Sequence, residues 1–292
     1  MRSIVSNKIE SVDKLLRRLS KDNFFGEEAK RLNSIREGVN TTIFIYESAL
    51  SIVNTNYGNN KMIYQVCNLL LLIYADATKI NSQQLNDILV SFVEGTVKDS
   101  DSENLTSYKN YIIENTKLAN SIKELTLRGS ITYVDRMTLG NDIAAHYSSA
   151  VEMVAKILVP LIQIDKLIGR KSFSPMKIEK MSTAAKLNTL RQSKHCDWDF
   201  IVQLINKNIR NAESHLNFSY NPELGKFDGK YFDGKSEKYV DISISTEEFV
   251  VQILKGVETV ILGYFLSNCM LYLSTEDKDK AKKIADIMGR EF

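Results

Sequence analysis

The chain has 292 residues, of which 43% are hydrophobic, enough for one large or two modest cores. Its 38 basic and 36 acidic residues nearly cancel to a net charge of +2, which excludes a global positive field that would attract nucleic acid to the whole surface. Three widely spaced cysteines form neither a disulfide framework nor a CxxC zinc site, so we expect a reducing, cytoplasmic environment and no metal or cofactor.

Sparse helix breakers predict an all-α helical bundle with one small β-hairpin. Proline occurs only three times and glycine 13 times, so long helices can run with few interruptions. Ser82 and Asp101 are expected N-caps in the first half of the chain. There, apolar residues at helical spacing predict helices near residues 8–21, 26–56, 60–80, 83–97 and 102–127.

The second half predicts a long core helix over residues 133–168, bent at Pro160, and a shorter helix near residues 176–192. We place a domain boundary near residue 130, between the two halves. Residues 1–130 then form an N-terminal helical region of unknown role, and residues 131–292 form a second helical domain.

A helix over residues 197–215 follows, with Trp198 anchoring its start in the core. Residues 216–245 alternate between apolar and polar at both ends of a glycine-rich stretch, which predicts a β-hairpin with a long connection. A helix over residues 246–273 and a short charged helix complete the chain.

The most apolar stretches of the chain predict buried helices rather than membrane spans. Residues 66–74 are too few to cross a bilayer, and residues 250–273 contain Lys255 and Glu258. The N-terminal residues include no apolar region typical of a secretory signal. We therefore expect a soluble protein without a membrane segment.

Arg210, Asn211 and His215 form the constellation with the clearest chemistry, at the end of the 197–215 helix. On a helix, Asn211 and His215 share a face, whereas Arg210 is rotated about 140° from His215. Arginine offers a permanently charged fork that matches phosphate oxygens, and histidine can move a proton to or from a ribose 2′-OH near neutral pH. These residue types predict cleavage of RNA through its own 2′-OH.

Such a reaction needs a base and an acid, and one histidine can be only one of them at a time. A two-fold dimer that joins the ends of two 197–215 helices would surround one phosphate with two arginines and two histidines. We therefore expect a homodimer through these helices.

The segment IRNAESH, residues 209–215, resembles the Arg-x4–6-His motif of the HEPN family, in which Asn, Asp or His commonly follows the arginine. The resemblance covers about residues 133–273, and some HEPN branches also have a polar hairpin after the motif. It implies a helical bundle, homodimerisation through the motif helices and metal-independent endoribonuclease activity that leaves a 2′,3′-cyclic phosphate. Many HEPN proteins are toxins or abortive-infection effectors against phage, so an antitoxin or a sensor protein is a further expected partner.

Carried over to this chain, Arg210 and His215 are the catalytic pair, Asn211 is their polar helper, and Glu213 occupies a variable position from which it could tune His215. The chain departs from HEPN toxins that have a tyrosine two residues after the histidine, because that residue here is Asn217. Control by modification of such a tyrosine is therefore in doubt.

Three alternatives stay open beside this reading. The arginine and histidine could be a surface residue and a helix-terminal residue stabilised by the helix dipole. The domain could also be a non-catalytic HEPN scaffold that binds RNA or a protein partner. A third reading makes the chain one half of a toxin–antitoxin pair.

The predicted hairpin contains candidate RNA-binding residues, namely Lys226, Lys230, Lys235 and Tyr231. They could equally be a solvated surface whose charges prevent edge-to-edge aggregation.

Two other histidines are interpreted as structural. His146 is expected in a core or an interface rather than in catalysis. His195 and Cys196 lack a second pair of metal ligands nearby in the sequence.

Overall fold

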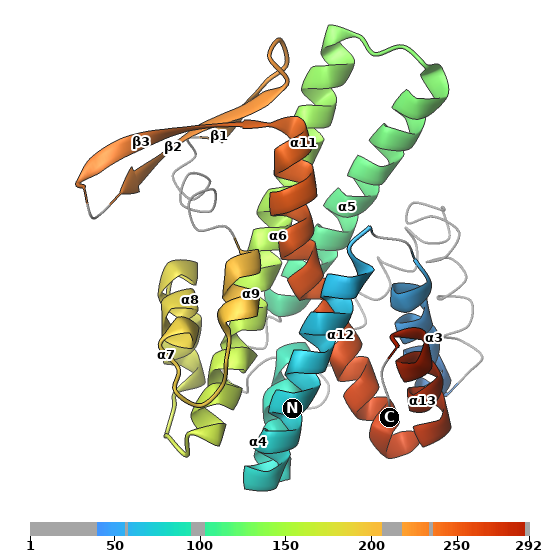
Figure 1. The fold of residues 1–292 in the computed structure, drawn as a ribbon, viewed down its shortest axis with the longest axis vertical. Helices are drawn as coiled ribbons and strands as arrows, with labels where there is room; N and C mark the ends of the chain where they lie inside the picture. The colour runs from blue at the N-terminus through green and yellow to red at the C-terminus, as the bar shows by residue number, and fades with distance from the viewer. Residues whose placement is uncertain (1–39, 56–57, 95–102, 206–217, 234–235, 290–292) are drawn as a thin grey trace.

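The computed structural model describes residues 40–55, 58–94, 103–205, 218–233 and 236–289 of the chain. These residues are mostly helical, with one small antiparallel sheet standing out from the helices (Figure 1), which confirms the predicted all-α bundle with a small β element. Within these residues, the helices before the sheet are α3 (Thr41–Asn54), α4 (Asn60–Glu94), α5 (Glu103–Arg128), α6 (Tyr133–Ile168), α7 (Pro175–Glu179), α8 (Thr183–Arg191) and α9 (Asp199–Leu204).

Helix α4 joins the two helices that were predicted for residues 60–80 and 83–97. The backbone leaves helical geometry only at Asn81, where φ is −162° and ψ is 97°. The side chain of Asn81 accepts a hydrogen bond from the backbone N–H of Gln84 at 3.0 Å, as an N-cap does. The prediction of Ser82 as the cap is therefore wrong by one residue. The predicted helix 8–21, the first part of the predicted helix 26–56 and the Asp101 cap lie outside the described residues, whereas the second part of helix 26–56 is α3, which begins after its N-cap Asn40.

Helices α5 and α6 form a long antiparallel hairpin that projects beyond the rest of the molecule (Figure 1). The bounds of α6 agree with the predicted 133–168, because Thr132 and Asp135 form a capping box at its start. Gly129, with a φ of +69°, makes the turn between the two helices. The predicted domain boundary falls at this turn, and it stays a prediction.

The helix predicted near residues 176–192 is two short helices. Ser182 separates α7 from α8, and its side chain accepts a hydrogen bond from the backbone N–H of Ala185. Serine, threonine, asparagine and aspartate favour caps over helix interiors, so this interruption follows from local chemistry.

The sheet has three strands rather than the two of the predicted hairpin. Strands β1 (Phe218–Asn221), β2 (Lys226–Asp233) and β3 (Lys238–Ser245) pair in the order β1-β2-β3. The glycine-rich stretch was predicted to be the connection between two strands, but most of it forms β2, the central strand. Gly225 has a φ of +62° and makes the β1–β2 turn, whereas Gly229 lies within the strand between Phe218 and Ile242.

The chain after the sheet is one long helical run that ends in a short helix. It consists of α11 (Thr246–Glu248), the π-helical segment η1 (Phe249–Leu254), α12 (Lys255–Glu276) and α13 (Lys278–Ile287). Among the described residues, the run Thr246–Glu276 alone is long and apolar enough to cross a membrane, and 61% of its most apolar window is buried in the protein. Packing of α12 against α3, α4 and α6 accounts for this apolar character.

Candidate functional site

The predicted catalytic residues Arg210, Asn211 and His215, together with Glu213, lie in residues 206–217, outside the described part of the chain. The structure describes both neighbours of this segment, namely Ile205 at the end of α9 and Phe218 at the start of β1. The candidate site is therefore built from the contacts that hold these two ends.

Close backbone packing holds the end of α9 on α12. A Cβ atom added to Gly256 of α12 would lie 2.4 Å from the backbone oxygen of Leu204. Only glycine permits this approach, because any side chain would overlap the carbonyl group. The neighbouring Ile201, Val202 and Ile205 are buried. The last turn before residues 206–217, here called the motif segment, is therefore fixed in the core.

The start of α9 is held by a buried polar contact. Trp198 is 1% exposed, and its indole N–H donates a hydrogen bond to Oδ1 of Asp165 on α6 at 3.1 Å. The hydroxyl of Ser193 donates to the same oxygen. This confirms the prediction that Trp198 anchors the helix start in the core.

Aromatic packing holds the strand that follows the motif segment. The ring of Tyr220 in β1 covers Gly140 of α6, where an added Cβ atom would lie 2.1 Å from the ring. Tyr220 contacts Phe227 of β2 with ring centres 5.0 Å apart, and Phe227 stacks on Phe249 at 4.4 Å. The motif segment is thus joined to the core at both ends.

The sequence did not indicate that Gly256 and Gly140 are packing positions, because each contacts a residue that lies far away in the chain. Their presence inside helices was the available signal, because glycine costs about 1 kcal/mol there relative to alanine.

Comparisons with protein-family models, curated proteins and solved structures found no match. Functional proposals for this chain therefore rest on its own residues.

The strand alternation of β2 places Lys226, Asp228 and Lys230 on one face of the sheet. Lys230 Nζ lies 3.3 Å from Oδ1 of Asp241, and both side chains are exposed. Tyr231 pairs with Val240 of β3 in the backbone register. The lysines of this face alternate with carboxylates, and the predicted Lys235 lies outside the described residues.

His146 is fully buried between α6 and α12, as expected of a core histidine. Its Nε2 lies 2.8 Å from Oε1 of Glu258, and its ring stacks on Tyr111 with centres 5.4 Å apart. Asp142, one turn earlier, instead accepts a hydrogen bond from the hydroxyl of Ser121 at 2.6 Å. The partner Glu258 is 112 residues away, so no local pattern indicated it.

An open hollow of about 370 Å³ lies at the loop before α9. Arg191, Lys194 and Asp197 contribute to its lining together with His195 and Cys196. Burial, followed by the nearby Asp165, raises the pKa of the Cys196 thiol to about 12, so it is not a thiolate at neutral pH. No group of three His, Cys, Asp or Glu side chains that could hold a metal ion occurs among the described residues.

Lys186 is a buried cation that joins α8 to α6. Its Nζ donates a hydrogen bond to the backbone oxygen of Ala155 at 3.1 Å. Burial, assisted by the charge of Lys156, lowers the pKa of Lys186 to about 8, while Glu179 acts in the opposite direction.

Proposed function

We propose that this protein is a metal-independent endoribonuclease of the HEPN type that acts as a homodimer. The observation that carries the proposal is the Arg-Asn-x3-His spacing of Arg210, Asn211 and His215. The anchoring of the flanking residues supports it, because catalytic groups act best when the elements that carry them are held firmly.

In the proposed reaction, one neutral His215 removes the proton from a ribose 2′-OH, and the 2′-oxygen attacks the adjacent phosphorus. The bond from phosphorus to the 5′-oxygen breaks, and a protonated His215 from the second copy donates its proton to that oxygen. The products are a 2′,3′-cyclic phosphate and a 5′-hydroxyl. Arg210 from each copy stabilises the negative charge on the phosphate oxygens, and Asn211 orients the group without adding charge.

The biological role that fits this activity is that of a toxin or an anti-phage defence effector. Uncontrolled RNA cleavage in the cytoplasm harms the cell, so an antitoxin or a sensor protein would hold the enzyme in check. Residues 1–130 are a candidate for receiving that control.

The decisive experiment incubates the purified chain with labelled tRNA, total RNA and matched DNA in EDTA. His215→Ala is the test variant, and His195→Ala is a matched control, since it removes a histidine from a loop before α9. We expect the wild type and His195→Ala to cleave RNA alone, with cyclic phosphate ends, and His215→Ala to be inactive. Cleavage by His215→Ala would refute the proposed chemistry, whereas RNA binding by all three proteins without any cleavage would favour the non-catalytic scaffold.

A further inference from the structure

The end of the α5–α6 hairpin, residues 122–137 and here called the hairpin tip, exposes many large hydrophobic side chains. Their exposed fractions lie between 43% and 78%. For side chains of this size, the exposed area amounts to about 600 Å², at the upper end of what the surface of a monomer usually displays. The residues are Ile122, Leu127, Ile131, Tyr133, Val134 and Met137.

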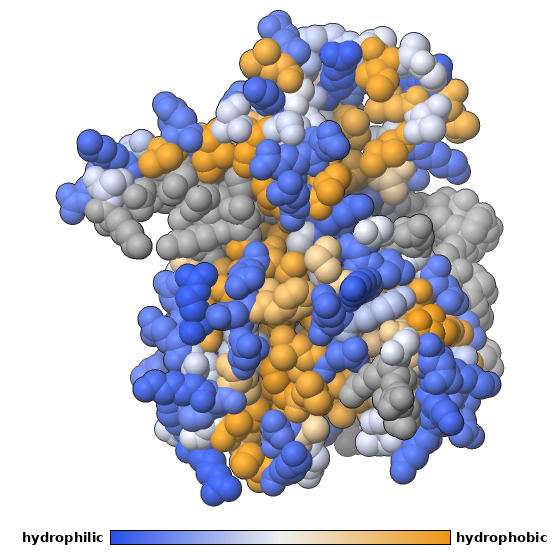
Figure 2. Space-filling view, viewed as in Figure 1, coloured by the Kyte–Doolittle hydropathy of each residue, from blue (hydrophilic) through white to orange (hydrophobic). Residues whose placement is uncertain are grey.

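Figure 2 shows hydrophobic residues among polar ones over the top of the molecule, where the two helices end. These exposed side chains are not the ones that hold the hairpin together. Leu125 and Leu139 are half-buried, and Leu139 packs against the core, whereas Tyr133 and Val134 lie four and three residues before Met137 on the exposed side of α6. At least 43% of each residue of the exposed set is left uncovered by the described chain.

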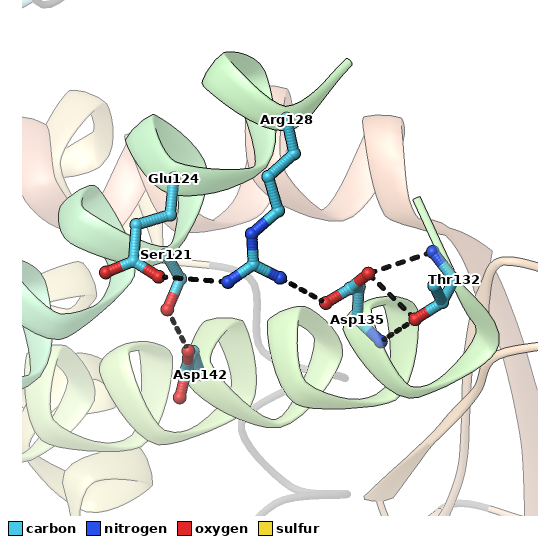
Figure 3. Close-up of polar contacts among 6 residues, drawn as sticks. All are labelled: Ser121, Glu124, Arg128, Thr132, Asp135 and Asp142. Carbon is cyan, nitrogen blue, oxygen red and sulfur yellow. Dashed lines mark hydrogen bonds and ion pairs between the residues drawn. The ribbon is translucent and has the colours of Figure 1, made fainter. Parts of the chain in front are cut away.

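Polar contacts fix the shape of the hairpin tip (Figure 3). The guanidinium of Arg128 lies 3.7 Å from a carboxylate oxygen of Glu124 and 3.4 Å from one of Asp135. Asp135 also accepts a hydrogen bond from the backbone N–H of Thr132 at 2.9 Å, within the capping box. Because these contacts order the backbone of the tip in advance, the conformational entropy lost on binding there would come mainly from the exposed side chains.

We propose that a second copy of this chain covers the hairpin tip. An area of about 600 Å² on each partner approaches the roughly 800 Å² per partner of a standard stable interface. Tyrosine, methionine and arginine, all present at the tip, are enriched at protein interfaces. The two acidic residues nearest the patch are already paired with Arg128, and Lys123 and Arg136 can extend their charged ends into water at the rim.

The position of the tip favours a copy of this chain over an unrelated partner, an argument that rests on the proposed two-copy function. Met137 lies one helical turn from Gly140, the residue covered by Tyr220 of β1. Strand β1 directly follows the motif segment, residues 206–217. The tip and the strand that borders the motif segment thus meet the same helix, α6, and a two-fold contact at the tip, in which each copy contributes the same surface, would join two motif segments in one assembly.

The test is sedimentation velocity of the full chain over a range of protein concentrations. Leu127→Glu combined with Val134→Glu places two charges at exposed positions, so the fold should be preserved, as circular dichroism would verify. Leu72→Glu is the matched control, because Leu72 is a leucine on α4 that is 61% exposed. We expect a dimer for the wild type and for the control, and a dissociation constant at least about tenfold higher for the double variant.

A dimer unaffected by the double substitution would overturn the proposal, and so would a wild type that is monomeric at every concentration. A monomeric wild type that bound anionic lipid vesicles through the tip would assign the surface to a membrane instead. RNA cleavage separates this inference from the proposed function. A monomeric double variant that still cleaves RNA would refute the two-copy mechanism and leave the tip interface standing, whereas an inactive wild-type dimer that the variant dissociates would refute only the nuclease.

Discussion

Replacement of Gly256 by alanine tests whether close backbone packing holds the end of α9. In an unobstructed helix this change stabilises the protein by up to about 1 kcal/mol, because alanine favours helical geometry more than glycine. Here the new methyl group would lie 2.4 Å from the oxygen of Leu204, so the two helices must separate by about 1 Å. Overpacking of this kind costs about 1–3 kcal/mol, and we expect the upper end because a backbone group cannot rotate away.

Urea denaturation followed by circular dichroism measures the change in the free energy of unfolding. Combining Gly256→Ala with Leu204→Ala should give additive losses, since the obstruction is the carbonyl group rather than the leucine side chain. The RNA cleavage rate should fall as well, because α9 leads directly into the motif segment. Unchanged or increased stability of Gly256→Ala would refute the close approach and its role in holding the site.

Three further predictions concern the surroundings of this anchor. Gly140→Ala should destabilise the protein by about 1–3 kcal/mol through its clash with Tyr220, and the loss should largely vanish in a Tyr220→Ala background, as a double-mutant cycle would measure. Glu258→Ala should cost about 1–3 kcal/mol in chemical denaturation, because it leaves the buried Nε2 of His146 without its acceptor. The pKa of Lys186 is lowered from 10.5 to about 8, so the unfolded chain holds this proton more firmly. Relative to a Lys186→Met variant, wild-type stability should therefore rise by about 1–2 kcal/mol as the pH increases from about 8 to about 10 in urea titrations.

Each of these predictions has a contrary outcome. Additive losses in the Gly140 and Tyr220 cycle would mean that the ring does not cover the glycine. A harmless Glu258→Ala would show that water reaches His146. A pH-independent difference between wild-type Lys186 and its methionine variant would show that the lysine titrates as it does in the unfolded chain.

The elements that follow from local chemistry could be predicted from the sequence. Helix α6 begins where Thr132 and Asp135 cap each other, a pattern that depends on residues three apart. The same logic applied to Asn81 would have identified the cap in α4, but apolar periodicity could not decide between a kink and a break. Elements that depend on distant pairing were harder, as Gly229 illustrates, because β2 exists as the central strand only through its two neighbours.

The candidate site shows the same difference between local patterns, which could be predicted, and distant contacts, which could not. The spacing of Arg210 and His215 is a local pattern, which the sequence alone displays. The contacts that hold its two flanks are non-local, because Gly256 meets Leu204 and Gly140 meets Tyr220 across long stretches of chain. Apolar periodicity reports which face of a helix is buried, and it does not report which residue of another helix meets that face.

The π-helical segment η1 sets the rotational phase between the sheet and the C-terminal helix. A π turn accommodates one residue more than an α turn, and such insertions are frequent at functional sites. Phe249, which stacks on Phe227, precedes this extra residue, whereas the buried face of α12 follows it. Deleting the exposed Val251 would restore a regular helix and turn everything before it by about 100° relative to α12, carrying Phe249 and the sheet stacked on it away from Tyr147 of α6. One residue in the middle of a helix thus determines the orientation of the strands that border the motif segment.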